Sequence, residues 1–295
     1  MNISFVLEVL IGGLLAGVMY SLVALGFVLI YKASGVFNYA QGSMVLFAAL
    51  SFVGLCELSV PIWLAVLLTV AIMIVLAWMV ERLVLRPLVN QEPITLFMAT
   101  IGISFFLDGF GQQVWGSDVH TLNIGIPQSP IFLGDILINQ FDLIAAVVAG
   151  SLVAALAVFF QYTPVGRALR AVADDHQAAM SVGIPLRSIW VVVWSAAGIV
   201  ALVAGIMWGS KLGVQFSVAL VALKALPVLI LGGFTSIPGA IIGGLIIGAG
   251  EKLSEVFLGP MLGGGIETWF AYMLAMLVLL IRPQGLFGER IIERV

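Results

Sequence analysis

Long apolar runs make up most of the chain and alternate with short polar stretches. A helix needs about 20 mostly apolar residues to cross the hydrocarbon core of a bilayer. By that rule the pattern predicts an all-α fold, a polytopic transmembrane helical bundle of about eight to nine spans. We expect the spans at residues 5–30, 39–55, 62–81, 94–115, 143–160, 189–209, 217–231, 239–256 and 267–281. The runs that begin at Tyr39, Ser217 and Gly239 are short ones.

Basic residues predict the orientation of these spans, because Lys and Arg accumulate in cytoplasmic loops. If every run crosses, one side receives Lys32, Arg82, Arg86, Arg167, Arg170, Arg187, Arg282, Arg290 and Arg294. The other side receives only Lys211 and Lys252. The N-terminus is then outside and the C-terminus is cytoplasmic. An even number of crossings must separate residues 162–187 from the tail, which favours a crossing at 217–231, interrupted at Pro227, over a re-entrant hairpin.

The composition agrees with an integral membrane protein. Hydrophobic residues make up 62% and charged residues 9% of the chain, and its mean hydropathy is +1.20; soluble domains carry about a quarter charged residues. A net charge of −3 without a basic run argues against nucleic-acid binding. The N-terminus lacks a basic region and carries Glu8, so we expect a retained first span instead of a cleaved signal. No long soluble stretch interrupts residues 1–295, which predicts a single transmembrane domain.

Residues 162–187 form a charged, Ala-rich segment between apolar runs. Thr163 is a good helix N-cap, Pro164 suits the first helical position, and Gly183 with Pro185 ends the run. Helical spacing places three charged residues on one side and four alanines on a loosely opposite face: Arg167, Arg170 and Asp174, and Ala168, Ala171, Ala178 and Ala179. The pattern predicts a surface helix that docks into a groove of a soluble partner. An amphipathic loop helix resting on the bilayer is the alternative.

Polar residues within the spans are candidates for function because charges at membrane depth are costly. Asp108, with Gln112 at the next turn, is expected in a translocation path or in a hydrogen bond between helices. Lys224 requires a carboxylate or a water-filled cavity, and Asp108 and Glu251 are both candidates. Glycines four residues apart favour close helix packing, as at Gly13 and Gly17, Gly239 and Gly243, and Gly244 and Gly248. Without ligand-spaced companions, His120 and His176 predict no metal site, and nothing indicates a cofactor.

Residues 37–43 and 234–240 resemble each other, since each places small polar residues and a glycine before a short helix. Paired interrupted segments of this kind mark the translocation path in transporters built from internal repeats. Asn38 in the first segment and Thr235 or Ser236 in the second are candidate helix caps. The candidate path residues are Asn38, Gln41, Gly42, Ser43, Asp108, Gln112, Gly232, Gly233, Thr235 and Ser236. The outer loop at 116–142 is expected to be ordered, either as a face that receives a binding protein or as a plain connection.

Three sequence blocks are similar to motifs of one transporter family. They are Y-K-A-S-G-V-F-N-Y-A-Q-G-S-M at 31–44, G-R-A-L-R-A-V-A-D-D-x-x-A-A-x-x-x-G-I at 166–184 and L-G-G-F-T-S-I-P-G-A-I-I-G-G at 231–244. Together they resemble the LivH-like permeases of ABC importers of the branched-chain amino-acid type. The resemblance implies that the middle block is the cytoplasmic segment that couples the permease to its ATPase. Its residues here are Gly166, Arg167, Ala168, Arg170, Ala171, Asp174, Ala178, Ala179, Gly183 and Ile184.

The resemblance also implies partners. They are a second, LivM-like permease subunit, two cytoplasmic ATPase subunits and a periplasmic or lipid-anchored substrate-binding protein, in a bacterial inner membrane. The chain contains no G-x-x-x-x-G-K-[ST] loop, so we expect a transporter subunit that is not an enzyme and that relies on ATP hydrolysis by another chain. Branched-chain or related small amino acids are the expected substrates. The alternatives are urea or short amides on the same architecture, or an ion-coupled secondary transporter or channel that uses Asp108 and Lys224.

Overall fold

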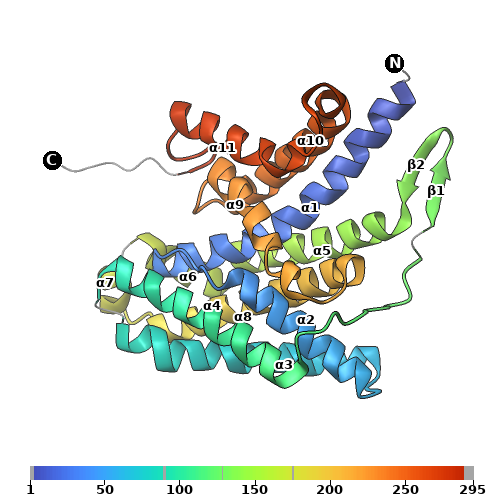
Figure 1. The fold of residues 1–295 in the computed structure, drawn as a ribbon. Coiled ribbons are helices and arrows are strands. Elements are labelled where there is room, and N and C mark those ends of the chain that lie inside the picture. Colours follow the sequence, from blue (N-terminus) through green and yellow to red (C-terminus); the bar gives the residue numbers. More distant parts are fainter. Residues whose placement is uncertain (1–2, 89–90, 128, 175, 289–295) are drawn as a thin grey trace. The chain divides into compact units, whose positions relative to one another are not determined.

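The computed structural model describes residues 3–88, 91–127, 129–174 and 176–288. Each of the predicted apolar runs contains a helix, which confirms the all-α polytopic architecture. These helices are α1 (Ile3–Ser34), α2 (Gln41–Glu57), α3 (Ile62–Val80), α4 (Pro93–Trp115), α5 (Gln140–Tyr162), α8 (Leu186–Leu212), α9 (Val221–Gly232), α10 (Ile237–Leu262) and α11 (Phe270–Ile281). Two shorter helices lie between α5 and α8, namely α6 (Pro164–Asp174) and α7 (His176–Ser181). Figure 1 shows the ribbon.

Fewer helices reach crossing length than the eight to nine spans expected. By length and composition, five described helices can cross: α1, α3 with its extension to Leu88, α4, α5 and α8. The segments Phe216–Gly232 and Ile237–Leu262 form a pair bent by 116°, which is a broken span or a re-entrant loop. The helix α9 has 12 residues and continues through Pro227, so the interruption lies between Gly232 and Ile237 and not at the proline. A 12-residue helix is about 18 Å long, too short to cross the ~30 Å core alone.

The chain divides into two compact units. Unit 1 comprises Met1–Val28, Gly125–Val153 and Leu223–Val295, and unit 2 comprises Leu29–Ile124 and Ala154–Ala222. The helices α1, α5 and α9 each run from one unit into the other. A single membrane domain therefore stays a prediction, and each unit is described by itself.

The helix α2 is the core of unit 2. Its residues from Gln41 to Gly54 are all buried, and Figure 1 shows α4 and α8 beside it. Gly205 lets α8 approach α2 closely, since a Cβ there would lie 2.7 Å from the Val45 carbonyl oxygen. Beyond α3 the chain continues as a π-helical turn (Glu81–Leu85) and a 3-10 turn (Arg86–Leu88).

Contacts at the two ends of unit 2 show which helix ends lie together. At one end, Glu81 lies 3.8 Å from Arg187, and the Trp190 Nε1 donates to the Ala33 carbonyl oxygen at 3.0 Å. At the other end, His120 Nδ1 lies 2.8 Å from Glu57 Oε1, and the His120 backbone pairs with Val214. The ends of α1 and α3 thus meet the start of α8, as successive crossings require. Which end faces the cytoplasm stays a prediction.

In unit 1, α1 and α10 cross at glycines. A Cβ on Gly13 would lie 2.7 Å from the Gly248 carbonyl oxygen, and one on Gly17 would lie 2.5 Å from that of Gly244. The Ser21 Oγ donates to the Ile241 carbonyl oxygen at 3.1 Å beside this crossing. The four-residue glycine spacing therefore serves close packing between these two helices, as expected.

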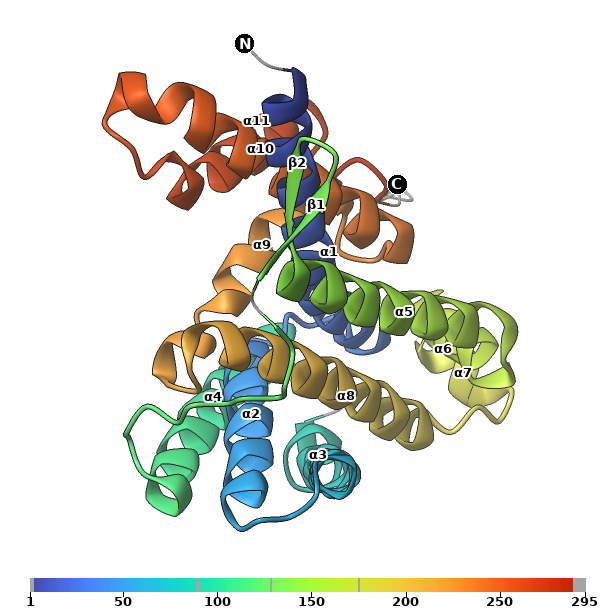
Figure 2. The ribbon, with the colours of Figure 1, turned by 90° about the vertical axis from the view of Figure 1, so that its right-hand side faces the viewer.

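The outer loop contains a hairpin that the sequence analysis did not predict. Antiparallel strands β1 (Pro130–Leu133) and β2 (Ile136–Asn139) pair around a turn at Gly134, whose φ is +64°; the hairpin is labelled in Figure 2. The Leu137 amide donates to Glu8 Oε2 at 3.1 Å, which ties the hairpin to α1. The sequence feature that could have predicted the hairpin is the Gly134-Asp135 turn between two short runs of β-branched and apolar residues.

Candidate functional site

The predicted coupling segment contains the described helices α6 and α7, and α6 contacts the end of α5. The Gly166 amide donates to Thr163 Oγ1 at 3.2 Å, and Pro164 opens α6, so the predicted helix start is confirmed. The predicted end is also confirmed, because α7 stops at Ser181 before Gly183, whose φ is +86°. The structure describes the segment as α6 and α7, which lie on either side of residue 175; that residue is outside the described part, so a single helical run stays a prediction.

Its two arginines hold α6 against α5. Arg170 donates from Nη1 to the Phe160 carbonyl oxygen at 2.8 Å and from Nη2 to that of Gln161 at 3.3 Å. Arg167 Nη1 donates to the Tyr162 carbonyl oxygen at 3.4 Å. These are the last carbonyls of α5, where cations are favoured by the unpaired acceptors and the helix dipole. The side chain of Asp174, the third charged residue of the predicted face, lies outside the described part of the structure.

Burial corrects part of the predicted docking face. Gly166 is buried, and a Cβ there would run into the Phe160 backbone. Ala179 is also buried, at 3% exposure, so neither residue reaches a partner. Ala168, Ala171 and Ile184 are half-buried. The predicted face is partly buried because tertiary packing covers these small residues with neighbouring parts of the protein.

The exposed apolar surface of the segment is formed by its later residues. Met180 is 47% and Val182 is 77% exposed, and Ala178 and Gly183 are exposed beside them. We call these four residues the docking edge. Large exposed apolar side chains outside the spans are what a protein partner buries. Met180 and Val182 were not predicted from the sequence, because the alanine spacing pointed to the small residues alone.

Six of the ten predicted path residues lie in unit 2, five of them along α2 and α4. Ser43 Oγ lies 2.7 Å from Ser104 Oγ, and Ser43 also donates a hydrogen bond to Asp108. Asn38 Nδ2 lies 3.5 Å from Gln41 Oε1. We call Asn38, Gln41, Ser43, Ser104 and Asp108 the polar seam. Among described residues, Gln41 Nε2 and Asp108 Oδ1 are buried without a partner, and such atoms are costly at membrane depth unless water or a ligand meets them. Gln112 is exposed on α4.

Asn38 does not cap α2 as predicted. Its Oδ1 accepts from the Ala40 amide at 3.1 Å, which closes a turn before the helix, and the N-cap Ala40 offers no side-chain acceptor. Gly42 is a packing residue, since a Cβ there would meet the Ala219 carbonyl oxygen and would lie 3.1 Å from the Ala222 Cβ.

The other four path residues, Gly232, Gly233, Thr235 and Ser236, lie in unit 1, at the bend between α9 and α10. Ser236 caps α10, because its Oγ accepts from the Gly239 amide at 3.0 Å, as predicted. The chain after α11 covers the two glycines: the Leu286 amide donates to the Leu231 carbonyl oxygen at 2.8 Å, and a Cβ on Gly233 would lie 2.7 Å from the Gly288 nitrogen. Both glycines are buried and make close backbone contacts.

Of the two carboxylates considered for Lys224, Glu251 lies in the same unit and within the range of a Coulombic interaction. Lys224 and Glu251 interact electrostatically, and the Tyr20 hydroxyl donates a hydrogen bond to the Glu251 carboxylate. Glu251 is 3% and Tyr20 4% exposed. Three helices, α1, α9 and α10, therefore meet at one buried polar cluster in unit 1.

Comparison with known families decides what this architecture is. The family model described as "Branched-chain amino acid transport system / permease component" matches residues 9–282. The chain belongs to this permease family. The matched range includes all three sequence blocks, so it confirms that this branched-chain permease resembles the family they indicated.

Curated relatives of this branched-chain permease agree along nearly its whole length. It is 29% identical to the "high-affinity branched-chain amino acid transport system permease protein LivH" of Escherichia coli, over 99% of this chain and 98% of the relative. It is also 29% identical to the permease protein BraD of the same kind of system in Pseudomonas aeruginosa, over 98% of both chains. A solved structure, PsaBC from Streptococcus pneumoniae in complex with Fab, shares the fold with a TM-score of 0.51 at 13% identity, over 94% of this chain and 93% of that one.

Proposed function

We propose that this chain is the membrane-spanning permease subunit of an ABC importer for branched-chain or related small amino acids. It moves substrate from a binding protein to the cytoplasm, with ATP hydrolysed by partner subunits. The full-length similarity to permeases named for high-affinity branched-chain amino-acid transport carries this proposal. The scarcity of charged side chains in the spans fits a zwitterionic substrate with an aliphatic side chain.

The proposed assembly contains a second, LivM-like permease, two cytoplasmic ATPase subunits and a substrate-binding protein, in a bacterial inner membrane. The N-terminus is outside and the C-terminus is cytoplasmic, in line with the excess of basic residues at one end of the spans. The docking edge receives the ATPase, and its movement switches the path between outward-open and inward-open states. The polar seam lines that path, where the buried Gln41 Nε2 and Asp108 Oδ1 have no hydrogen-bond partner among the described residues.

Uptake by reconstituted proteoliposomes tests the proposal. The complex that copurifies with this chain is expected to accumulate leucine, isoleucine or valine only when ATP and the binding protein are supplied. Urea in excess should leave this uptake unchanged. Uptake that follows an ion gradient without ATP would instead support a secondary transporter, and competition by urea would support the amide alternative.

The docking edge predicts an uncoupled variant. Met180→Asp with Val182→Asp places two charges on exposed apolar positions outside the spans, so the permease should still fold. We expect ATPase binding to weaken at least about tenfold, since apolar anchors at the centre of an interface commonly contribute more than about 1.4 kcal/mol. The measurement is ATPase copurification together with ATP-dependent uptake.

A matched control is Gln91→Asp, an exposed position in the turn between α3 and α4, outside the docking edge. It should retain both ATPase binding and uptake. If the double variant assembled and transported like the parent, the ATPase would dock elsewhere.

A further inference from the structure

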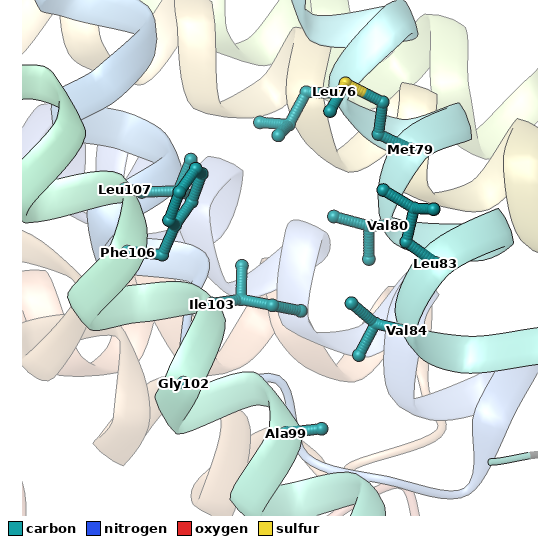
Figure 3. Close-up of a pocket in the computed structure, with 10 residues that line it drawn as sticks. All are labelled: Leu76, Met79, Val80, Leu83, Val84, Ala99, Gly102, Ile103, Phe106 and Leu107. Atoms are coloured by element: carbon teal, nitrogen blue, oxygen red, sulfur yellow. The ribbon is translucent and has the colours of Figure 1, made fainter. Parts of the chain in front are cut away.

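An apolar groove runs between α3 and α4 in unit 2 (Figure 3). Its volume is about 380 Å³. One wall comes from α3 and its π-helical turn, through Leu76, Met79, Val80, Leu83 and Val84, and the other comes from α4. Gly102 has no side chain to fill the groove, and a Cβ there would meet nothing within 4 Å. The lining residues belong to two helices long enough to cross a membrane, so we infer that the groove lies at membrane depth.

Two arginines stand where the α3 wall ends. Arg82 and Arg86 follow Met79 and Leu83 at three-residue spacing, and both are exposed. The Arg82 guanidinium lies 5.2 Å from the centroid of the Trp78 ring, and Trp78 is itself 48% exposed. Half-exposed tryptophan beside arginine is typical of the membrane–water interface. The α3 wall of the groove therefore ends at the same level along the helix as two exposed arginines, although Trp78, beneath Arg82, does not itself line the groove.

These arginines are not neutralised by carboxylates within the described chain. The nearest acidic residue in the sequence, Glu81, is 2% exposed and lies against Arg187 instead. Neither Arg82 nor Arg86 has an ion pair with a described residue. The end of the groove thus offers two positive charges to a ligand outside the chain.

The flanks of the groove favour a flexible chain over a helix as its occupant. Phe105 is 71% and Phe106 61% exposed on α4, and Leu83 is 64% exposed on the opposite wall. Close helix association in membranes uses small residues at the contact surface, whereas these bulky side chains keep a second helix at a distance. An acyl chain can pass between them.

We propose that this groove binds an anionic phospholipid, with one acyl chain between α3 and α4 and the phosphate on Arg82 and Arg86. Apolar side chains hold the chain, and the two guanidinium groups select the headgroup charge. The site is distinct from the docking edge and from the polar seam.

Native mass spectrometry of the purified full-length protein, in the complex that copurifies with it, tests the proposal. The probes are phosphatidylglycerol and phosphatidylcholine with identical acyl chains. Gly102→Leu fills the groove and is expected to remove one tightly bound lipid of either kind. Gly109→Leu is the matched control, because Gly109 is also exposed on α4 with nothing within 4 Å of a Cβ, but does not line the groove. It should keep the lipid.

Headgroup recognition is tested separately. Arg82→Gln with Arg86→Gln is expected to weaken phosphatidylglycerol binding about 30-fold, the effect of two basic residues at an anionic headgroup. Phosphatidylcholine binding should be unchanged, and Lys252→Gln, an exposed basic residue of α10, should change neither.

Three outcomes overturn the proposal. Gly102→Leu could retain the same number of lipids as the parent, which would place the bound lipid elsewhere. The double glutamine variant could weaken both lipids equally, which would remove the role of the arginines. Finally, Gly102→Cys could cross-link to another subunit of the copurified complex, which would show that a protein helix fills the groove.

Discussion

Gly17→Leu is expected to prevent stable packing of α1 on α10. A Cβ at this position would lie 2.5 Å from the Gly244 carbonyl oxygen and 2.9 Å from the Leu245 Cα. Both are backbone atoms of a helix, so no side-chain rotation relieves the clash, and the two helices must separate. Overpacking of a closed site costs about 1–3 kcal/mol when neighbours adjust, and more when the backbone must move. We expect more than about 3 kcal/mol, measured by unfolding in mixed micelles.

Gly12→Leu provides the matched control. Gly12 is five residues earlier on the same helix, and a Cβ there would meet nothing within 4 Å. The hydrophobicity and size of the new side chain are identical, so any difference between the variants reports the glycine crossing alone. Equal stability of the two variants would mean that α1 and α10 do not approach each other at Gly17.

The position of the helices was predictable from the sequence, but their pairing was not. Apolar runs of the right length located every described helix except α6 and α7, because a span must present apolar side chains to lipid on most of its surface. The spacing of Gly13 and Gly17 predicted a close contact, yet any of the other small-residue faces could have been its partner. Identifying Gly244 and Gly248 required the three-dimensional structure.

Fewer described helices reach crossing length than the number of predicted spans, because hydropathy does not give the length of each helix. Residues 217–231 are apolar enough for a span, but α9 begins at Val221 and the chain turns after Gly232. The turn is made by backbone, with Gly233 at a φ of +101° and Ser236 capping the next helix. The sequence placed a boundary at the same residues, between the predicted spans 217–231 and 239–256, but apolar runs of this length do not show whether each of the two segments crosses by itself.

For the candidate coupling segment, the sequence predicted the helix ends but not the exposed face. Its start and end followed from Thr163, Pro164 and Gly183, whose conformational preferences act locally. Its exposed face depended on which residues α5 and α8 cover, which is a tertiary property. The helical spacing of the alanines therefore indicated a docking face, but burial of Ala179 and exposure of Val182 moved the apolar surface to the end of α7.

Lys224→Met is expected to destabilise unit 1 by leaving the Glu251 carboxylate buried beside Tyr20 without its cationic neighbour. Glu251 is 3% exposed on α10, where solvent cannot replace the lysine. Lys224 is half-buried and attracts Glu251 by a Coulombic interaction, so we expect a loss of about 1–3 kcal/mol, the cost of leaving a buried polar group without compensation. The measurement is again the free energy of unfolding in mixed micelles.

Adding Glu251→Gln to Lys224→Met is expected to recover most of this loss, because the second change removes the uncompensated charge while the amide can still accept from Tyr20. Replacement of a buried pair by neutral groups of similar volume is commonly close to neutral. Lys252→Ala is the control on the same helix: its 3.3 Å pair with Glu267 is between side chains 46% and 35% exposed, so it should cost at most about 1 kcal/mol. If the single and double variants were equally unstable, the lysine would act through its packing, and Glu251 would not be its electrostatic partner.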